Sequence, residues 1–255
     1  METLCEAAAS VGLNPDDDFR SSFRRYYELI ESGNSKFNLT GAKGWERVRD
    51  ELFIRSLRFL APVAGGFIAP IEWFDGRRVL DVGTGAGIPG LVLKLAVPGM
   101  SLTLMDSSRK KTAFLREVVD DLSIANVDVI TGRAEEFGQE PAHRQKYDLV
   151  VSRGVARLVE LTELTLPFVM PGGAMVSAKG PDTASEIDEA AFAAGLLGAA
   201  PAVASTVSEP GQASPDTMIY YMKIGDTPAE FPRRTGIPHS KPLVERQVGA
   251  ALDAE

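Results

Sequence analysis

The stretch at residues 79–90, VLDVGTGAGIPG, constrains the fold of this chain more than any other. It is a short apolar run that ends in glycines, which is typical of a buried strand whose last turn lets the backbone approach a ligand. From residue 78 onward, strand-like and helical segments alternate. This predicts an α/β fold with a largely parallel sheet and a ligand site beyond the carboxyl ends of the strands. The expected strands lie at 78–83, 101–106, 127–131, 147–152, 173–179, 202–208 and 217–224, and the expected helices near 89–97, 109–123, 157–169 and 183–197.

A helical region precedes this alternating part. Residues 16–33 predict an amphipathic helix that begins with acids and ends at Gly33, with an aromatic face that packs into a core. Residues 45–61 predict further helix, and residues 62–78 a connection. The expected division is an N-terminal helical cap at 1–65, a main α/β domain at 66–227, and a basic, Pro-rich tail at 228–255 that lies over the surface.

The composition predicts a cytoplasmic globular protein. Apolar residues make up 44% of the chain and charged residues 24%, which is ordinary for such proteins. No apolar run approaches the ~20 residues that span a bilayer, and the start, METLCEAAAS, lacks the pattern of a signal peptide. Cys5 is the single cysteine, so we expect neither an internal disulfide nor a metal centre.

The charge of the chain is distributed unevenly. The net charge of −8 argues at first against a nucleic-acid partner. However, residues 20–58 hold nine Lys or Arg against five acids, and residues 77–116 hold seven against two. Because local fields steer a polyanion, these basic stretches favour RNA. The alternative is that they are solvated helix faces without a partner.

The glycine turn leaves a choice between two cofactor classes. No Lys-Ser or Lys-Thr pair follows it, which excludes a P-loop. Gly85, Gly87 and Gly90 satisfy the dinucleotide pattern G-x-G-x-x-G, so a nicotinamide cofactor stays a rival. Asp81 argues against it, because a carboxylate at the strand end repels a pyrophosphate and favours the cationic ammonium and sulfonium of S-adenosylmethionine. The alternative role of Asp81 is a buried cap or ion-pair partner.

Asp106 ends the next expected strand, SLTLMD. At that position we expect its carboxylate to accept hydrogen bonds from both ribose hydroxyls of the cofactor. Dinucleotide sites use an acid at a similar spacing, so Asp106 supports a ribose without identifying the cofactor. The alternative role is a helix N-cap, and the two roles are compatible.

Motifs along most of the chain resemble one known family. They occur in a single order and are NLTG at 38–41, VLDVGTGAGIPG at 79–90, LMDSSRKKTAFL at 104–115, ITGRAEEF at 130–137, VVSRGVARL at 150–158, SAKG at 177–180 and FPRRTGIP at 231–238. Together they resemble the small-subunit (16S) ribosomal RNA guanine-N7 methyltransferases, also called glucose-inhibited division protein B. The resemblance implies the class I S-adenosylmethionine-dependent methyltransferase fold, a Rossmann-like seven-stranded sheet after a small helical region.

The resemblance also implies roles for individual residues. Gly83 and Ile88 would contact the cofactor in the glycine turn. Ala134 and Glu135 would border its adenine and ribose. Arg153 would lie where the cofactor and the target base meet. The chain departs from the family at Leu52 and Arg55, where a His and an Asp often stand, and this departure bears on the substrate more than on the fold.

Methylation of guanine N-7 suits these residues, because that nitrogen presents a lone pair and needs no proton removal. Alignment of the base with the methyl group supplies much of the rate. We therefore expect Arg153 to act at the reacting centre, on a guanine edge, a phosphate or the cofactor carboxylate, with a structural ion pair as its alternative. His143 and His239 are expected to be surface residues. Six cations are expected to contact RNA, with solvated side chains as the alternative: Arg109, Lys110, Lys111, Lys179, Arg233 and Arg234.

The expected partner is 16S ribosomal RNA or the small ribosomal subunit, bound by a monomer. The sequence does not specify which guanine is modified. One rival is a methyltransferase that acts on a small molecule or a protein, which would not need the basic stretches. A second is a non-catalytic RNA-binding relative, which would not need the intact glycine turn and Asp106. An oxidoreductase is a more distant third.

Overall fold

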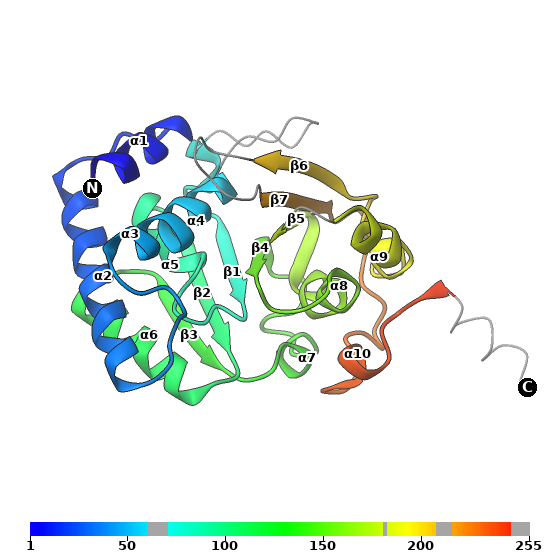
Figure 1. Cartoon of the computed structure of the whole chain (residues 1–255). Coiled ribbons are helices and arrows are strands. Elements are labelled where there is room, and N and C mark those ends of the chain that lie inside the picture. Colours follow the sequence, from blue (N-terminus) through cyan, green and yellow to red (C-terminus); the bar gives the residue numbers. More distant parts are fainter. Residues whose placement is uncertain (61–70, 181–182, 208–215, 246–255) are drawn as a thin grey trace, which may run out of the picture. The chain divides into compact units, whose positions relative to one another are not determined.

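The computed structural model describes residues 1–60, 71–180, 183–207 and 216–245 of the chain (Figure 1). The chain divides into two compact units, Met1–Gly132 and Arg133–Glu255. The predicted division at residues 65 and 227 stays a prediction, since residue 65 lies outside the described residues. No helix among the described residues is long and apolar enough to cross a membrane.

The first unit begins with α1 (Glu2–Ser10) and α2 (Asp17–Lys36). Helix α2 starts where its sequence predicts, because the Asp16 carboxylate accepts the Phe19 N–H at 2.8 Å. The predicted end at Gly33 is wrong, since the helix continues to Lys36. Gly33 packs closely instead: a Cβ there would lie 2.9 Å from Leu39 Cδ2 and 3.0 Å from the Phe114 ring, so a larger residue would force these side chains to shift.

The predicted helical stretch at 45–61 is an unbroken run of short helical pieces. It consists of α3 (Trp45–Arg47), the π-helix η1 (Val48–Ile54), α4 (Arg55–Leu57) and the 3-10 helix η2 (Arg58–Leu60). The predicted connection falls largely on residues 61–70, outside the described residues, and η3 (Ile71–Phe74) follows.

A parallel three-stranded part of the sheet follows in the first unit, in the order β3-β2-β1. Its strands are β1 (Arg78–Val82), β2 (Ser101–Asp106) and β3 (Val127–Thr131), as the sequence predicts. Helix α5 (Gly90–Ala96) follows β1, and α6 (Arg109–Asp121) follows β2. Strands β1 and β2 are apolar and almost wholly buried, as expected for parallel strands with both faces covered.

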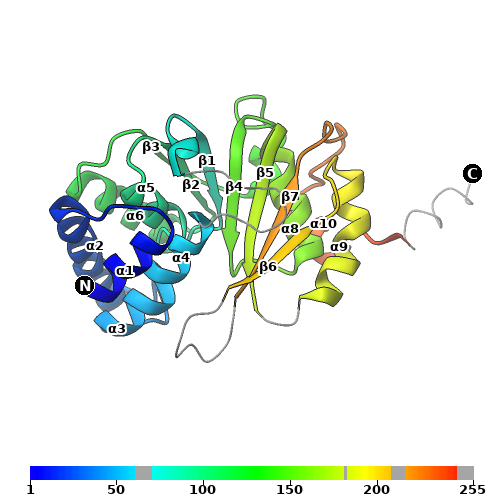
Figure 2. The ribbon, with the colours of Figure 1, turned by 90° about the horizontal axis from the view of Figure 1, so that it is seen from above.

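The second unit begins with α7 (Ala134–Phe137), a short helix that the sequence analysis missed. Its strands have the order β4-β5-β7-β6 and lie side by side in Figure 2. They are β4 (Tyr147–Arg153), β5 (Val169–Lys179), β6 (Val203–Val207) and β7 (Asp216–Met222). Strands β4 and β5 are parallel, whereas β7 runs antiparallel to both of its neighbours. The predicted α/β class with a seven-stranded sheet is confirmed.

Helices complete the second unit. Helix α8 (Leu158–Thr165) packs against α9 (Ala184–Leu196) and against α10 (Ile237–Ser240), which belongs to the C-terminal segment (Figure 1). A 3-10 turn, η4 (Leu166–Phe168), leads from α8 into β5.

The C-terminal segment 228–243 does not simply lie over the surface, and that expectation is wrong. The side chains of Phe231 and Leu243 are each only 7% exposed. The Arg144 guanidinium donates to the carbonyl oxygens of Phe231 at 2.5 Å, Thr227 at 2.7 Å and Pro228 at 2.9 Å. A Pro-rich segment has few backbone donors for its own carbonyls, so Arg144 satisfies two of them, together with the carbonyl of Thr227 just before the segment, and anchors it.

Candidate functional site

The glycine turn after β1 has the geometry that its sequence predicts. Gly83, Gly85 and Gly87 have φ values of +73°, +60° and +95°, which residues with a Cβ rarely adopt. A Cβ on Gly87 would lie 2.6 Å from the Tyr26 hydroxyl, and one on Gly90 would lie 2.8 Å from the Asp81 carboxylate. Glycine is therefore required at these places by the backbone conformation and by close packing.

Asp81 stabilises this turn through two hydrogen bonds. Its side chain is fully buried, and Oδ2 accepts hydrogen bonds from the Thr84 hydroxyl at 2.6 Å and from the Gly90 N–H at 2.8 Å. The second bond satisfies a free N–H at the start of α5. The role visible in the structure is thus the buried cap that the sequence analysis gave as the alternative. The electrostatic attraction of a cationic ligand by Asp81 stays a prediction.

Asp106 connects the glycine turn with the start of α6. Its carboxylate is 7% exposed, with Oδ2 accepting the Gly85 N–H at 2.9 Å and Oδ1 accepting the Ser108 N–H at 2.8 Å. Ser108, not Asp106, is the N-cap residue of α6. A carboxylate oxygen can accept two hydrogen bonds, and each oxygen of Asp106 accepts one from the backbone. Asp106 can therefore still accept hydrogen bonds from a diol beside the turn.

The basic residues at the start of α6 differ among themselves. Lys111 Nζ lies 3.9 Å from Asp106 Oδ2, and it would lie 3.9 Å from a Cβ on Gly85, so Lys111 reaches over the glycine turn. Arg109 and Lys110 are exposed and form no ion pair within the described part of the chain. Of the three predicted RNA contacts, Lys111 therefore lies beside the glycine turn, whereas Arg109 and Lys110 are in solvent.

Tyr26 of α2 also contacts the turn, which sequence reasoning missed. Its hydroxyl donates to the Ala86 carbonyl at 2.6 Å, and its ring stacks on Phe53 with centroids 5.3 Å apart. Burial, together with the negative charge of Asp81, raises the pKa of Tyr26 well above its ordinary value, so the hydroxyl stays a donor. Helical spacing assigned this ring correctly to a core face. A buried hydroxyl requires a partner, and that requirement was the available signal.

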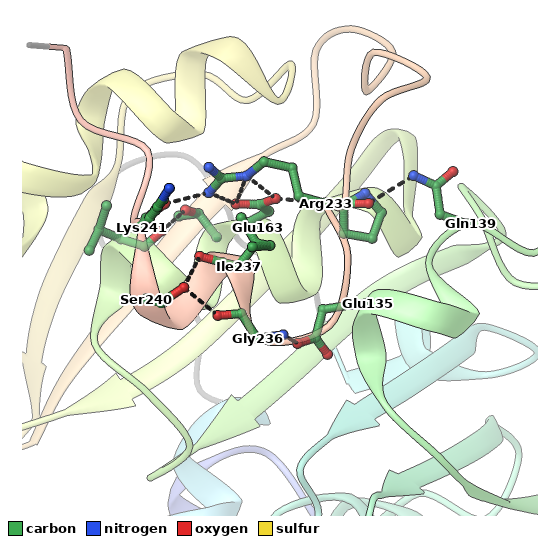
Figure 3. Close-up of polar contacts among 11 residues, drawn as sticks. Glu135, Gln139, Glu163, Arg233, Gly236, Ile237, Ser240 and Lys241 are labelled. Atoms are coloured by element: carbon green, nitrogen blue, oxygen red, sulfur yellow. Dashed lines mark hydrogen bonds and ion pairs between the residues drawn. The ribbon is translucent and has the colours of Figure 1, made fainter. Parts of the chain in front are cut away.

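In the second unit, Ala134 and Glu135 open α7 and are each 9% exposed. Glu135 Oε1 accepts the Gly236 N–H of the C-terminal segment at 3.0 Å (Figure 3). Gln139, just after α7, donates through Nε2 to the Pro232 carbonyl at 2.8 Å. The predicted cofactor-side carboxylate is therefore attached to the C-terminal segment.

Arg153 is the last residue of β4, half-buried and paired in register with Ala178 of β5. It lies at the carboxyl end of its strand, where ligands of α/β sheets bind. Its predicted catalytic and cofactor-binding roles stay predictions.

Three predicted RNA contacts of the second unit have different surroundings. Lys179 Nζ donates to Glu186 Oε2 at 2.9 Å and to the Ala156 carbonyl at 2.5 Å, and its side chain is 13% exposed. Arg233 pairs with Glu163, whose side chain is 1% exposed, at 2.6 Å. Arg234 is exposed. Two of these cations thus have carboxylate partners inside the protein, and one faces solvent.

The two histidines have partners on the second unit. His143 Nδ1 lies 2.8 Å from the Tyr147 hydroxyl, and His239 Nδ1 lies 3.1 Å from Glu160. His239 is exposed, as expected, whereas His143 is half-buried and stacks on Tyr147. Among the described residues, no group of three or more His, Cys, Asp or Glu side chains could hold a metal ion.

The departure from the family motif lies in the first unit. Leu52 belongs to the π-helix η1 and Arg55 begins α4, and both are half-buried. The Ser56 hydroxyl donates to the Leu52 carbonyl at 2.5 Å. The position of the two residues does not by itself indicate an effect on the substrate.

Comparisons with known proteins agree with this geometry. The family described as rRNA small subunit methyltransferase G matches residues 20–213. A ribosomal RNA small subunit methyltransferase G from Pelotomaculum thermopropionicum is 37% identical over 95% of this chain and 98% of its own length. One from Dehalococcoides mccartyi is 36% identical over 96% of this chain and all of its own length. Among solved structures, a protein from Klebsiella pneumoniae described as an O-methyltransferase is similar, with a TM-score of 0.52, 14% identity, and coverage of 78% of this chain and 90% of its own.

Proposed function

Since the chain belongs to the rRNA small subunit methyltransferase G family, we propose that it methylates N-7 of a guanine in 16S ribosomal RNA. It is a methyltransferase with the class I fold, and S-adenosylmethionine is its cofactor. The closest rivals, another methyl acceptor or a non-catalytic RNA-binding protein, become outcomes of the experiment below.

The observation that carries the proposal is the carboxylate of Asp106 bonded to the glycine turn. Its two backbone donors, Gly85 and Ser108, fix both oxygens beside the turn without using up their acceptor capacity. A buried second carboxylate, Asp81, supports the same turn. Two carboxylates fit a cation with a ribose better than a pyrophosphate, which they would repel. The residues present therefore fit S-adenosylmethionine.

S-adenosylmethionine, when bound, supplies a methyl group on a positively charged sulfur. The chain's residues would bind and orient it: Asp106 would accept hydrogen bonds from the ribose, and the backbone of the glycine turn would pack against the amino-acid part. Guanine N-7 would form the new bond to the methyl carbon with its own lone pair while the carbon–sulfur bond breaks and the neutral thioether leaves, so no residue has to remove a proton. Arg153, at the carboxyl end of β4, orients the base or a neighbouring phosphate. Catalysis then depends mainly on alignment.

Exposed cations supply the proposed RNA surface. Arg109 and Lys110 at the start of α6 and Arg234 after the paired Arg233 are in solvent and available to phosphates. Lys179 and Arg233 have carboxylate partners, so they contribute less. We propose that the enzyme acts as a monomer in the cytoplasm.

The experiment is transfer of labelled methyl groups to unmodified 16S rRNA, both naked and in small subunits, with nucleoside mass spectrometry of the product. We expect 7-methylguanosine, with loss of most activity in Asp106→Asn. Asp128→Asn changes an exposed aspartate of β3 and serves as the matched control. A different methylated nucleoside would refute the N-7 assignment. No RNA product with intact cofactor binding would shift the acceptor to another class of molecule.

A further inference from the structure

Glu163 of α8 is a carboxylate that the fold buries almost completely, at 1% exposure. Among the described residues its hydrogen-bond donors all belong to Arg233. The Arg233 backbone N–H donates to Oε1 at 2.8 Å, Nε donates to Oε1 at 2.9 Å, and Nη2 donates to Oε2 at 2.6 Å. A buried carboxylate is tolerated only with such partners, so the C-terminal segment must dock for α8 to pack.

The same arginine closes a small loop in the C-terminal segment. Arg233 Nη2 also donates to the Lys241 carbonyl at 2.8 Å (Figure 3). Within this loop, Ser240 donates through Oγ to the Gly236 carbonyl at 2.9 Å and through its N–H to the same oxygen at 3.0 Å. Gly236 itself has a φ of +83°, a left-handed conformation that glycine adopts readily. We call residues 233–241 the clasp.

The clasp reaches Glu135 through that N–H. Gly236 donates to Glu135 Oε1 at 3.0 Å. Glu135 Oε2 forms no hydrogen bond or ion pair with any residue that the structure describes. Pro232, next to the clasp, packs on α7 as well, since a Cβ on Gly138 would lie 2.7 Å from Pro232 Cγ. The carboxylate thus has one oxygen held by the clasp and one oxygen available to a ligand.

The position of Glu135 in the chain favours a role for its Oε2 in binding the cofactor. Glu135 follows β3 by four residues, at the carboxyl end of a parallel strand, where ligands of such sheets bind. Gly132, three residues before it, donates its N–H to the backbone carbonyl of Asp106 at 3.1 Å. A carboxylate that follows the end of a parallel strand in this way suits a hydroxyl-bearing group of a ligand.

We propose that Arg233 is a positioning residue for the cofactor: the clasp that it forms with Glu163 orients Glu135, and the affinity for S-adenosylmethionine depends on it. The inference rests on the proposed function, because it takes S-adenosylmethionine as the ligand. It assigns to Arg233 a role in the cofactor site in place of a contact with RNA phosphate.

The test is a double-mutant cycle on the full-length chain, with the dissociation constant for S-adenosylmethionine measured by calorimetry. We expect Glu135→Ala and Arg233→Ala each to weaken binding about tenfold, the size of one charge-assisted hydrogen bond. We expect the double variant to bind about tenfold, not a hundredfold, more weakly than the parent, because both changes remove the same interaction. Arg157→Ala, which breaks an exposed Arg–Glu pair on the same unit, is the matched control and leaves the affinity unchanged.

Arg233→Lys keeps the test valid if Arg233→Ala unfolds. A lysine keeps a positive charge beside Glu163, but its single amine cannot make the paired hydrogen bonds of a guanidinium and also reach the Lys241 carbonyl. We therefore expect S-adenosylmethionine to bind about threefold more weakly, and thermal unfolding to show that the variant is folded.

Three outcomes overturn the inference. If the Arg233 variants lower only the unfolding temperature, the clasp is purely structural. If the double variant binds about a hundredfold more weakly, the effects of the two substitutions are independent, and the clasp acts on the cofactor by a route other than Glu135. If Glu135→Ala binds normally, Glu135 is not a cofactor residue. The proposed function fails separately, when the unaltered chain does not bind S-adenosylmethionine or yields no methylated RNA.

Discussion

The start of α6 and the clasp are both rich in cations, yet they use them in opposite ways. At the start of α6, Arg109 and Lys110 stand in solvent without an ion pair within the described part of the chain, and the first turn carries no acid. In the clasp, Arg233 is locked onto a buried carboxylate by four hydrogen bonds. Cations at a helix N-terminus oppose the helix dipole, so α6 bears a small cost that the clasp does not.

This contrast shows that a basic residue in a suitable motif has two possible partners, one inside the protein and one outside it. Burial of the carboxylate decides between them. Where a buried acid lies opposite, the cation stabilises the fold; where none does, its charge is free to attract phosphate. Each prediction below tests one side of this comparison.

The largest effect is expected at the buried side. Arg233→Ala leaves the Glu163 carboxylate buried without its partner, which costs about 3–5 kcal/mol and lowers the unfolding temperature by roughly 6–20 °C. Differential scanning calorimetry measures both quantities. A loss below about 1 kcal/mol would show that Glu163 reaches water, and the comparison would then fail.

The exposed side is expected to affect RNA and not stability. Arg109→Ala with Lys110→Ala removes two phosphate contacts, so RNA affinity falls on the order of tenfold and the slope of log affinity against log salt decreases by about 2. The unfolding free energy stays within about 0.5 kcal/mol. Titrations of a 16S rRNA fragment at several salt concentrations measure the slope, and an unchanged slope would remove these residues from the interface.

Lys179 lies between the two extremes, and its contribution depends on pH. Burial raises the pKa of Glu186, but hydrogen bonds from Lys179 and the Leu158 N–H, together with the nearby positive charges, outweigh burial and hold the pKa below its ordinary 4.5. A carboxyl whose pKa is lowered in the folded state stabilises above its ordinary pKa and loses that contribution as pH falls. Lys179→Met is therefore expected to cost about 1 kcal/mol at pH 7 and less as pH falls below 4.5.

Urea unfolding of Lys179→Met and its parent at pH 7, 5 and 3.5 would show this trend. A difference that stays constant with pH would mean that the Ala156 carbonyl, not Glu186, is the partner that matters.

The smallest effect is expected at Arg234, the exposed neighbour of Arg233. Arg234→Ala should change the unfolding free energy by less than about 0.5 kcal/mol and reduce the salt slope of RNA binding by about 1. Of the two adjacent arginines, Arg233 is then expected to contribute severalfold more to stability, and Arg234 more to RNA binding. Equal stability losses at both positions would remove the distinction between the two sides.

Much of the fold could be predicted from the sequence, because the signals were local. Apolar runs such as VLDV and LTLM ended where the strands end, and Asp16 began α2 as an N-cap. Positive φ values at Gly83 and Gly85 followed from the turn itself. Signals of this kind depend on neighbours in the chain, so they survive without knowledge of the tertiary structure.

The sequence was least informative where a partner lies far along the chain. Gly33 was taken as a helix end because its contact with Phe114 is invisible in sequence. The ion pair of Arg233 with Glu163 was not foreseen because the two residues lie 70 positions apart, and the RNA contact of Arg233 stays a prediction. Asp81 gave no local sign that it would bond Gly90 and Thr84. In each case charge or residue type was known, but the burial that decides its role was not.

The distance in sequence between Glu163 and Arg233 also bears on the order in which this chain matures. During synthesis α8 leaves the ribosome well before the clasp does, so its carboxylate has no guanidinium to pair with until Arg233 has been made. A chain that ends before Arg233 leaves the Glu163 carboxylate buried without its partner, so its folded state is less stable. The clasp therefore completes the packing of α8, because only a chain that includes Arg233 can bury Glu163 at low cost.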